Sequence, residues 1–136
     1  MDKERLKDNL QLYYQQKGSS DIDMIVQTAE EIMKLLNIDI EDDSIFLSKI
    51  EEEEKICMFY KTNIIITTPI NVKEGNIEYQ IYPFAFKEIS IKQRNSSQGD
   101  VKILMENNKS ILIALNNESA MSCICEIIKE KNQWKS

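Results

Sequence analysis

The acidic side chains are the most distinctive group of potentially reactive residues in this chain of 136 residues. Carboxylate oxygens are the ligands that hard cations such as Ca²⁺ prefer. A calcium-binding EF-hand loop that began at Asp39 would need glycine in place of Ser44 and glutamate in place of Ile50, so this motif is excluded. Two interpretations remain: a surface that docks on a basic partner or mimics a nucleic-acid backbone, or a solvated turn that maintains solubility. The cluster comprises Asp39, Glu41, Asp42, Asp43, Glu51, Glu52, Glu53 and Glu54.

Imidazole and thiol chemistry is limited by the composition. The chain has no histidine, which excludes a Ser-His-Asp triad, a Cys-His dyad, a histidine-ligated zinc and a histidine pH switch. Its three cysteines, Cys57, Cys123 and Cys125, lie in apolar stretches, as is typical of reduced thiols in a cytosol. Cys123 and Cys125 would face different directions on a helix, and four soft ligands are not available. We therefore expect buried structural thiols, with no metal and no other cofactor.

The sequence contains no recognisable catalytic arrangement. With only Gly18, Gly75 and Gly99, it cannot form a glycine-rich phosphate loop. Its carboxylates stand in solvated runs and lack the hydrophobic surroundings that raise the pKa of an acid catalyst. We predict that the protein is not an enzyme.

Two aromatic residues form a further candidate interaction site. Phe84 and Phe86 follow Pro83 at the end of a predicted strand. An exposed pair of rings would suit a peptide-binding or dimer surface. The alternative is that at least one ring caps the hydrophobic core. Among the basic residues, Lys92, Arg94 and Lys102 could line one face of a sheet, or simply protect it from aggregation.

The charge is divided unevenly along the chain. Residues 1–54 carry 15 acidic and 6 basic side chains, whereas residues 55–136 carry 8 and 11, which gives −9 and +3 within the total of −6. An acidic chain lacks the basic footprint that phosphate contacts need, so we expect no nucleic-acid binding.

The sequence also indicates where the protein acts. The longest aliphatic run, Ile64–Ile66, is far shorter than the ~20 apolar residues that cross a bilayer. The N-terminus has mixed charges and no apolar run of the kind found in secretion signals. We expect a cytoplasmic protein that does not insert into membranes. The 22 Ile, 15 Lys and 11 Asn residues suggest an AT-rich coding sequence, as in a low-GC bacterium or its phages.

Three helices are predicted from apolar residues at helical spacing. The first contains Leu6, Leu10, Tyr13 and Tyr14 and stops at Gly18. The second is capped by Ser20 or Asp21 and has an apolar stripe from Ile22 to Leu36. The last covers 117–131 and is capped by Asn116 or Asn117.

From Ser44 onward the hydrophobic period becomes two, which is typical of strands. The connections are too short for parallel crossovers, so an antiparallel meander is expected. The predicted strands are 44–50, 55–60, 63–70, 77–83, 87–94, 100–106 and 109–115.

Two segments carry a resemblance to a known family: Lys61–Ile66, which reads KTNIII, and Tyr82–Ile89, which reads YPFAFKEI. The predicted order of seven short strands followed by one amphipathic helix is also that of a PH-like domain. With these two segments, residues 44–131 resemble the small bacterial PH-like and GRAM-like domains. The resemblance implies a bent sheet whose open end is plugged by the C-terminal helix. Some PH-like domains bind phosphoinositides through a basic loop between the first strands. The corresponding loop here is Glu51–Glu54, which would repel a phosphate, so phosphoinositide binding is disfavoured. The chain also departs from the family pattern at Asn63, where a basic residue is usual.

These observations predict an α+β fold with N-terminal helices, a seven-stranded antiparallel bent sheet or partly open PH-like barrel, and a C-terminal capping helix. We expect a single domain over residues 1–136, with a helical extension over 1–40 and the barrel over 41–136. The main alternative is a two-layer sandwich with helices on one face of an open sheet.

The expected function is a non-catalytic cytosolic protein-interaction module, with a protein partner or self-association. The apolar stripe of the extension would pack on the barrel or form a dimer interface. The alternative is a phage or mobile-element inhibitor that docks its acidic segment on a basic host protein.

Overall fold

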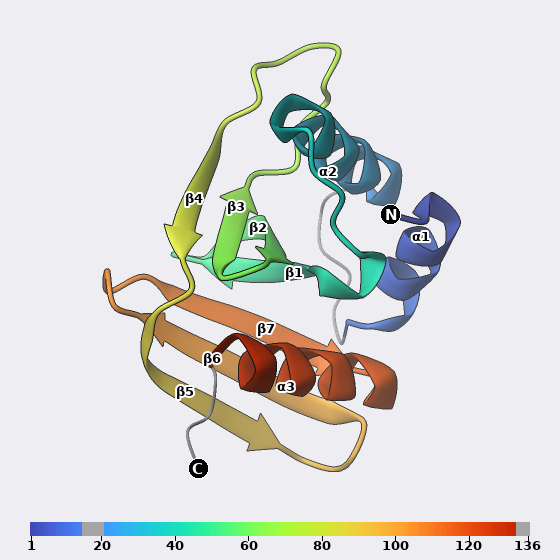
Figure 1. Ribbon diagram of the computed structural model, residues 1–136. Helices are drawn as coiled ribbons and strands as arrows, with labels where there is room; N and C mark the ends of the chain where they lie inside the picture. The colour runs from blue at the N-terminus through green and yellow to red at the C-terminus, as the bar shows by residue number, and fades with distance from the viewer. Residues whose placement is uncertain (15–20, 133–136) are drawn as a thin grey trace.

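The computed structural model describes residues 1–14 and 21–132 (Figure 1). Two helices, α1 (Lys3–Leu12) and α2 (Ile22–Leu36), precede a short 3₁₀ helix, η1 (Asp42–Ser44). Seven strands and a final helix, α3 (Glu118–Asn132), follow. The strands are β1 (Ile45–Ile50), β2 (Glu53–Tyr60), β3 (Asn63–Thr67), β4 (Tyr79–Pro83), β5 (Phe86–Gln93), β6 (Gln98–Met105) and β7 (Ser110–Asn116).

The seven strands form one antiparallel sheet that curves into a half-barrel, in the order β4-β3-β2-β1-β7-β6-β5. The first four and the last three strands are meanders, which join where β1 pairs with β7. Consequently β4 and β5 are consecutive in sequence but form the two edges of the sheet. The predicted α+β class, antiparallel sheet and C-terminal helix are confirmed.

Alternating side chains of β2 and β3 belong to two different hydrophobic cores. Ile64 lies in a core on the concave face of the sheet, whereas its neighbour Ile65 lies in a core on the outer face. Cys57 and Met58 divide in the same way on β2. Both faces of these strands are therefore buried, which explains why they are nearly continuous runs of apolar residues.

The helices cover opposite faces of the sheet, so the two-layer alternative with helices on one face is wrong. α3 contributes Met121 and Ile124 to the concave core, and its first turn is capped by the Asn117 side chain, which accepts a hydrogen bond from the Ala120 N–H (3.1 Å). α1 and α2 cover the outer face. The α2 stripe packs on the sheet of its own chain, with Ile25 and Ile32 fully buried.

The Tyr13–Tyr14 segment differs from the prediction. The helical spacing extended the first helix through both tyrosines, but α1 ends at Leu12. The next residues enter the weak junction between β1 and β7 instead. The Tyr13 carbonyl accepts a hydrogen bond from the Asn116 N–H (2.6 Å), and the Tyr14 hydroxyl accepts one from the Leu47 N–H (2.7 Å). These hydrogen bonds to the sheet stabilise the folded chain more than one further turn of α1 would.

The predicted element boundaries are otherwise close to those observed. The N-cap of α2 is Asp21, whose side chain accepts a hydrogen bond from the Asp23 N–H (2.8 Å). The predicted stop at Gly18 and the alternative cap Ser20 lie outside the described residues. The third predicted strand is shorter than expected, since β3 ends at Thr67.

Candidate interaction surfaces

Glu51 and Glu52 form the two-residue turn between β1 and β2. Their φ angles are 54° and 66°, and Ile50 pairs with Glu53 across the turn, which is the geometry of a type I′ hairpin. Asn-Gly is the favoured sequence for such turns because other residues are strained at positive φ. Both glutamates are exposed. The second half of the acidic cluster is thus a solvated and strained turn.

The negative charge of Glu53, the next residue of this hairpin, is partly neutralised. Glu53 Oε2 lies 3.3 Å from Lys55 Nζ, and this ammonium donates a hydrogen bond to Thr68 Oγ1 (2.7 Å). A pocket of about 230 Å³ opens beside them, lined by Glu51, Glu53, Lys55 and Lys109 among others. The charges of two carboxylates and two ammonium groups cancel in this pocket, so it has no strong preference for an anion or a cation.

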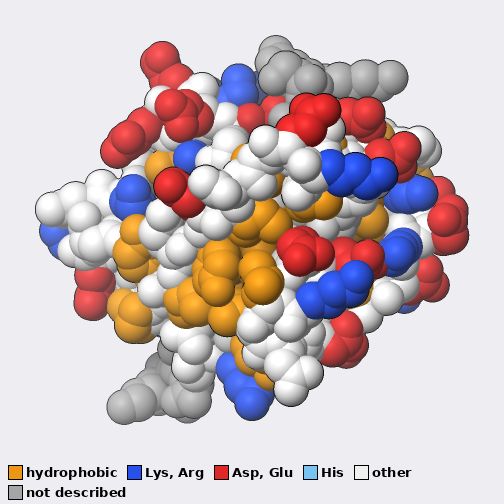
Figure 2. Space-filling model, turned by 90° about the horizontal axis from the view of Figure 1, so that it is seen from above, with side chains coloured by type: hydrophobic (Ala, Val, Ile, Leu, Met, Phe, Trp, Pro, Cys, Tyr) orange, Lys and Arg blue, Asp and Glu red, His pale blue; other side chains and the backbone are white. Residues whose placement is uncertain are grey.

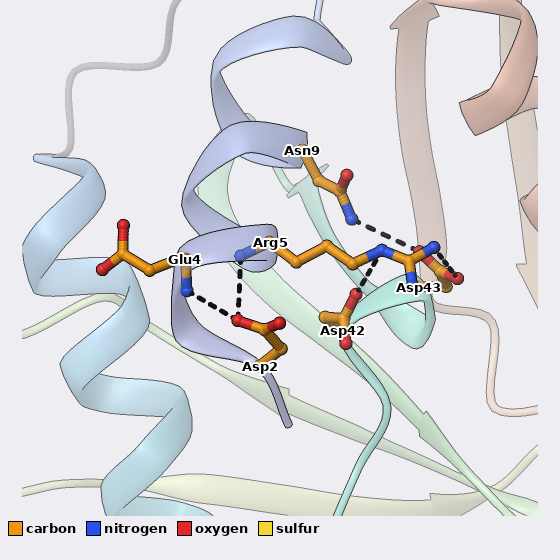
Figure 3. Close-up of polar contacts among 6 residues, drawn as sticks. All are labelled: Asp2, Glu4, Arg5, Asn9, Asp42 and Asp43. Atoms are coloured by element: carbon orange, nitrogen blue, oxygen red, sulfur yellow. Dashed lines mark hydrogen bonds and ion pairs between the residues drawn. The ribbon is translucent and has the colours of Figure 1, made fainter.

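In the first half of the acidic cluster, Asp42 and Asp43 are paired with residues of α1 (Figure 3), whereas Glu41 is exposed. Arg5 Nε lies 3.1 Å from Asp42 Oδ2, and Arg5 Nη2 lies 3.0 Å from Asp43 Oδ2. Asn9 also donates a hydrogen bond to Asp43 (3.4 Å), and the N-terminal ammonium lies 2.5 Å from Asp39 Oδ1. These acids hold α1 against η1. The role of Arg5 was not predicted from its sequence position; its rarity as one of two arginines is the one signal that points to it.

A second pocket, of about 480 Å³, lies next to this cluster and is lined by Arg5, Tyr13, Asp43, Ser122 and Cys123 among others. Burial raises the pKa of Tyr13 to about 12 and also raises the pKa of the Cys123 thiol. Both groups therefore stay protonated near neutral pH. A thiol is nucleophilic only as the thiolate, so the pocket offers no activated nucleophile.

The three cysteines have different environments. Cys57 is fully buried, its sulfur lies 2.9 Å from Ser48 Oγ, and burial raises the pKa of its thiol to about 12. Cys123 is half-buried, whereas Cys125 is exposed. The expectation of buried thiols is therefore wrong for Cys125, because its position on α3 turns away from the sheet.

The Pro83–Phe86 corner directs its first ring inward. Phe84 is only 8% exposed and belongs to the concave core. It continues a row of rings, with centroids 5.3 Å apart for Phe59–Phe84 and 5.6 Å apart for Phe84–Phe86. Phe86 is half-buried and packs against the same core. The structure therefore places these residues in the core rather than in an exposed aromatic pair.

The two edge strands differ in their protection against further pairing. β5 carries Lys87, Glu88 and Lys92, all exposed. Charged residues of this kind are the usual means of blocking an edge. β4 has no charged residue, and its Ile81 is 48% exposed. In the part of the chain that the structure describes, no strand pairs with the outer edge of β4, which lies at the margin of the molecule (Figure 1).

Apolar side chains adjoin the β4 edge on the outer face of the sheet. Ile81 pairs with Ile65, and Tyr79 pairs with Thr67, so both point to the outer face. Tyr79 and the preceding Ile77 pack against the outer core but stay partly exposed. Figure 2 looks down on the end that carries α2 and the β3–β4 connection, and hydrophobic side chains gather near its centre. Sequence periodicity identified this strand but did not show that it lies at an edge.

Comparison with protein-family models and with curated proteins finds no match for this chain. Membership of the PH-like family thus stays a prediction. Among the described residues, no three Cys, Asp or Glu side chains are grouped so that they could hold a metal ion. No helix in the described ranges is long and apolar enough to cross a membrane.

Proposed function

We propose that this protein is a non-catalytic, cytosolic interaction module that binds a protein partner as an additional strand along β4. The observation that carries this proposal is the contrast between the edges: β5 bears charged residues, whereas β4 bears none and exposes Ile81. Unprotected apolar edges tend to pair with further strands. Strand addition is also a common mode of peptide recognition. The composition supports an origin in a low-GC bacterium or its phage.

The state of the reactive groups supports a role without catalysis. Burial raises the pKa values of Tyr13, Cys57 and Cys123, which keeps these groups protonated and poorly nucleophilic. Arg5 is already paired with two carboxylates. At the β4 edge the features available to a partner are backbone groups and apolar side chains, which are suited to binding.

Selection of peptides from a displayed random library tests the proposal. Peptides that bind the wild-type protein are measured against Ile81→Lys and against a matched control, Ile91→Lys. Ile91 is a 45% exposed isoleucine of the other edge strand, β5. We expect Ile81→Lys to weaken binding by about tenfold or more, and the control to leave it unchanged. Selected peptides that bind Ile81→Lys as tightly as wild type would show that β4 is not the docking edge.

The second candidate function is an inhibitor that docks its acidic hairpin on a basic host protein. The strained Glu51–Glu52 turn favours it, because a more stable turn sequence would lack these charges. Affinity purification from the native host with Glu51 to Glu54 all changed to lysine tests this function. Recovery of the same host protein in the same amount would eliminate it.

A further inference from the structure

The direction of the backbone groups on β4 can be derived from the ladder. The Phe84 N–H donates a hydrogen bond to the Thr62 carbonyl (2.8 Å). In an antiparallel sheet, successive residues direct their N–H and C=O groups to opposite neighbours. Counting back in steps of two, Tyr82 and Gln80 bond to β3, whereas Ile81 and Tyr79 direct their backbone groups to the free edge.

We propose that the partner of this edge is β4 of a second copy of the chain, paired antiparallel around a two-fold axis at Gln80. This inference rests on the proposed function of the β4 edge. In this register Tyr79 of each copy lies opposite Ile81 of the other. The N–H and C=O groups of both residues are then satisfied. Pro83, which has no N–H to donate, lies beyond the paired residues.

The side chains are complementary in the same register. Tyr79 and Ile81 share the outer face of the sheet, so an aromatic ring of one copy meets a β-branched side chain of the other. Such cross-strand pairs stabilise sheets. Gln80 meets Gln80 on the concave face, and Glu78 meets Tyr82. No like charges are placed opposite each other.

The charge of the molecule favours this strand over other surfaces as the contact between copies. The chain carries a net charge of −6, so two copies repel each other over much of their surface. The segment Tyr79–Pro83 is uncharged, which makes close approach least costly there. Self-pairing of β5 would instead bring its exposed Lys87 and Lys92 toward the same two lysines of the second copy.

Sedimentation or light scattering over a range of concentrations tests the inference. Wild-type protein should change from the 15.9 kDa monomer to twice that mass as concentration increases. Ile81→Lys should weaken dimerisation by about tenfold or more, while Ile91→Lys should behave as wild type. Circular dichroism confirms that both variants fold. A monomer at every concentration, or dimerisation unaffected by Ile81→Lys, would overturn the inference.

A cysteine variant tests the register independently. Gln80 residues that face each other across the two-fold axis would have Cβ atoms close enough for a disulfide. In a Cys125→Ser background, which removes the exposed thiol, Gln80→Cys should form a covalent dimer under mild oxidation. Ser90→Cys on exposed β5 is the control and should form much less. Equal yields from the two variants would contradict the register.

The two proposals fail in different ways. If wild-type protein stays monomeric but the library peptides bind it and are lost in Ile81→Lys, the second copy is wrong and the β4 docking edge stands. If Ile81→Lys changes neither dimerisation nor peptide binding, both proposals fail.

Discussion

The Tyr14 hydroxyl accepts the Leu47 N–H at the junction between β1 and β7. Tyr14→Phe removes this acceptor and leaves the partly buried Leu47 N–H without its partner. We expect a loss of about 1–3 kcal/mol in the free energy of unfolding, measured by urea denaturation. Tyr82→Phe on β4, which removes the same atom from another half-buried ring, is the control. Equal stability of Tyr14→Phe and wild type would show that this hydrogen bond does not support the junction.

The two glutamates of the β1–β2 turn lower the stability of the protein, because they are strained at positive φ. Replacing Glu51 and Glu52 by Asn and Gly supplies the residues that a type I′ turn prefers at positive φ. We expect the free energy of unfolding to increase by about 1 kcal/mol. Replacement of the same two residues by glutamine removes the charges but keeps the strain, and should give little change. If the glutamine variant gains as much stability, charge repulsion rather than backbone strain is the cause.

Among the secondary-structure elements, α2 is held on the sheet by the apolar side chains of one of its faces. Ile32 is fully buried in the outer core, whereas Leu35, in the same helix, is 58% exposed. Ile32→Ala should destabilise the protein by about 2–5 kcal/mol, because it leaves a cavity between helix and sheet. Leu35→Ala should change stability by less than about 0.5 kcal/mol. Similar losses from both substitutions would mean that a second molecule covers the outer side of α2.

The strands show how far an element can be predicted from its own residues. The residue pattern identified all seven: alternation of period two marks strands such as β6, and continuous apolar runs mark β2 and β3. For β4 the same pattern did not distinguish an edge from a centre. That property depends on which strand lies beside it, and the nearest neighbour in sequence, β5, lies at the opposite edge.

At the scale of the whole molecule, several buried groups link stability to alkaline pH. Burial raises the pKa of Cys57 from 9.0 to about 12 and that of Tyr13 from 10.0 to about 12. Both groups favour the folded state while they are protonated. Their contribution is complete below the unfolded pKa values and is lost as the pH rises through about 9 to 12.

We therefore expect the urea midpoint to fall steadily above pH 9. Tyr13→Phe removes one titrating group, so its midpoint should fall less steeply than that of wild type between about pH 10 and 12. Tyr60→Phe, which removes the hydroxyl of a half-buried tyrosine at the end of β2, is the comparison. Identical slopes for Tyr13→Phe and wild type would show that Tyr13 does not contribute to alkaline destabilisation.

The candidate interaction residues could be predicted only in part. The sequence identified Glu51 to Glu54 as an acidic segment, and the structure shows Glu51 and Glu52 on a solvated turn. It could not show that Asp42 and Asp43 are engaged by Arg5, because these residues are far apart in the chain. Phe84 shows the same limit, since only the folded corner directs its ring into the core.

The α+β class, the seven strands, the amphipathic helices and the absence of histidine chemistry could all be predicted from the residues alone. These properties follow from local periodicity and composition, which act over a few residues. Contacts in the folded chain place α1 and α2 on the outer face and α3 on the concave face, bring Tyr14 into the β1–β7 junction and make the uncharged strand β4 an edge. Those outcomes depend on contacts between residues distant in sequence, and such contacts leave no periodic signal along the chain.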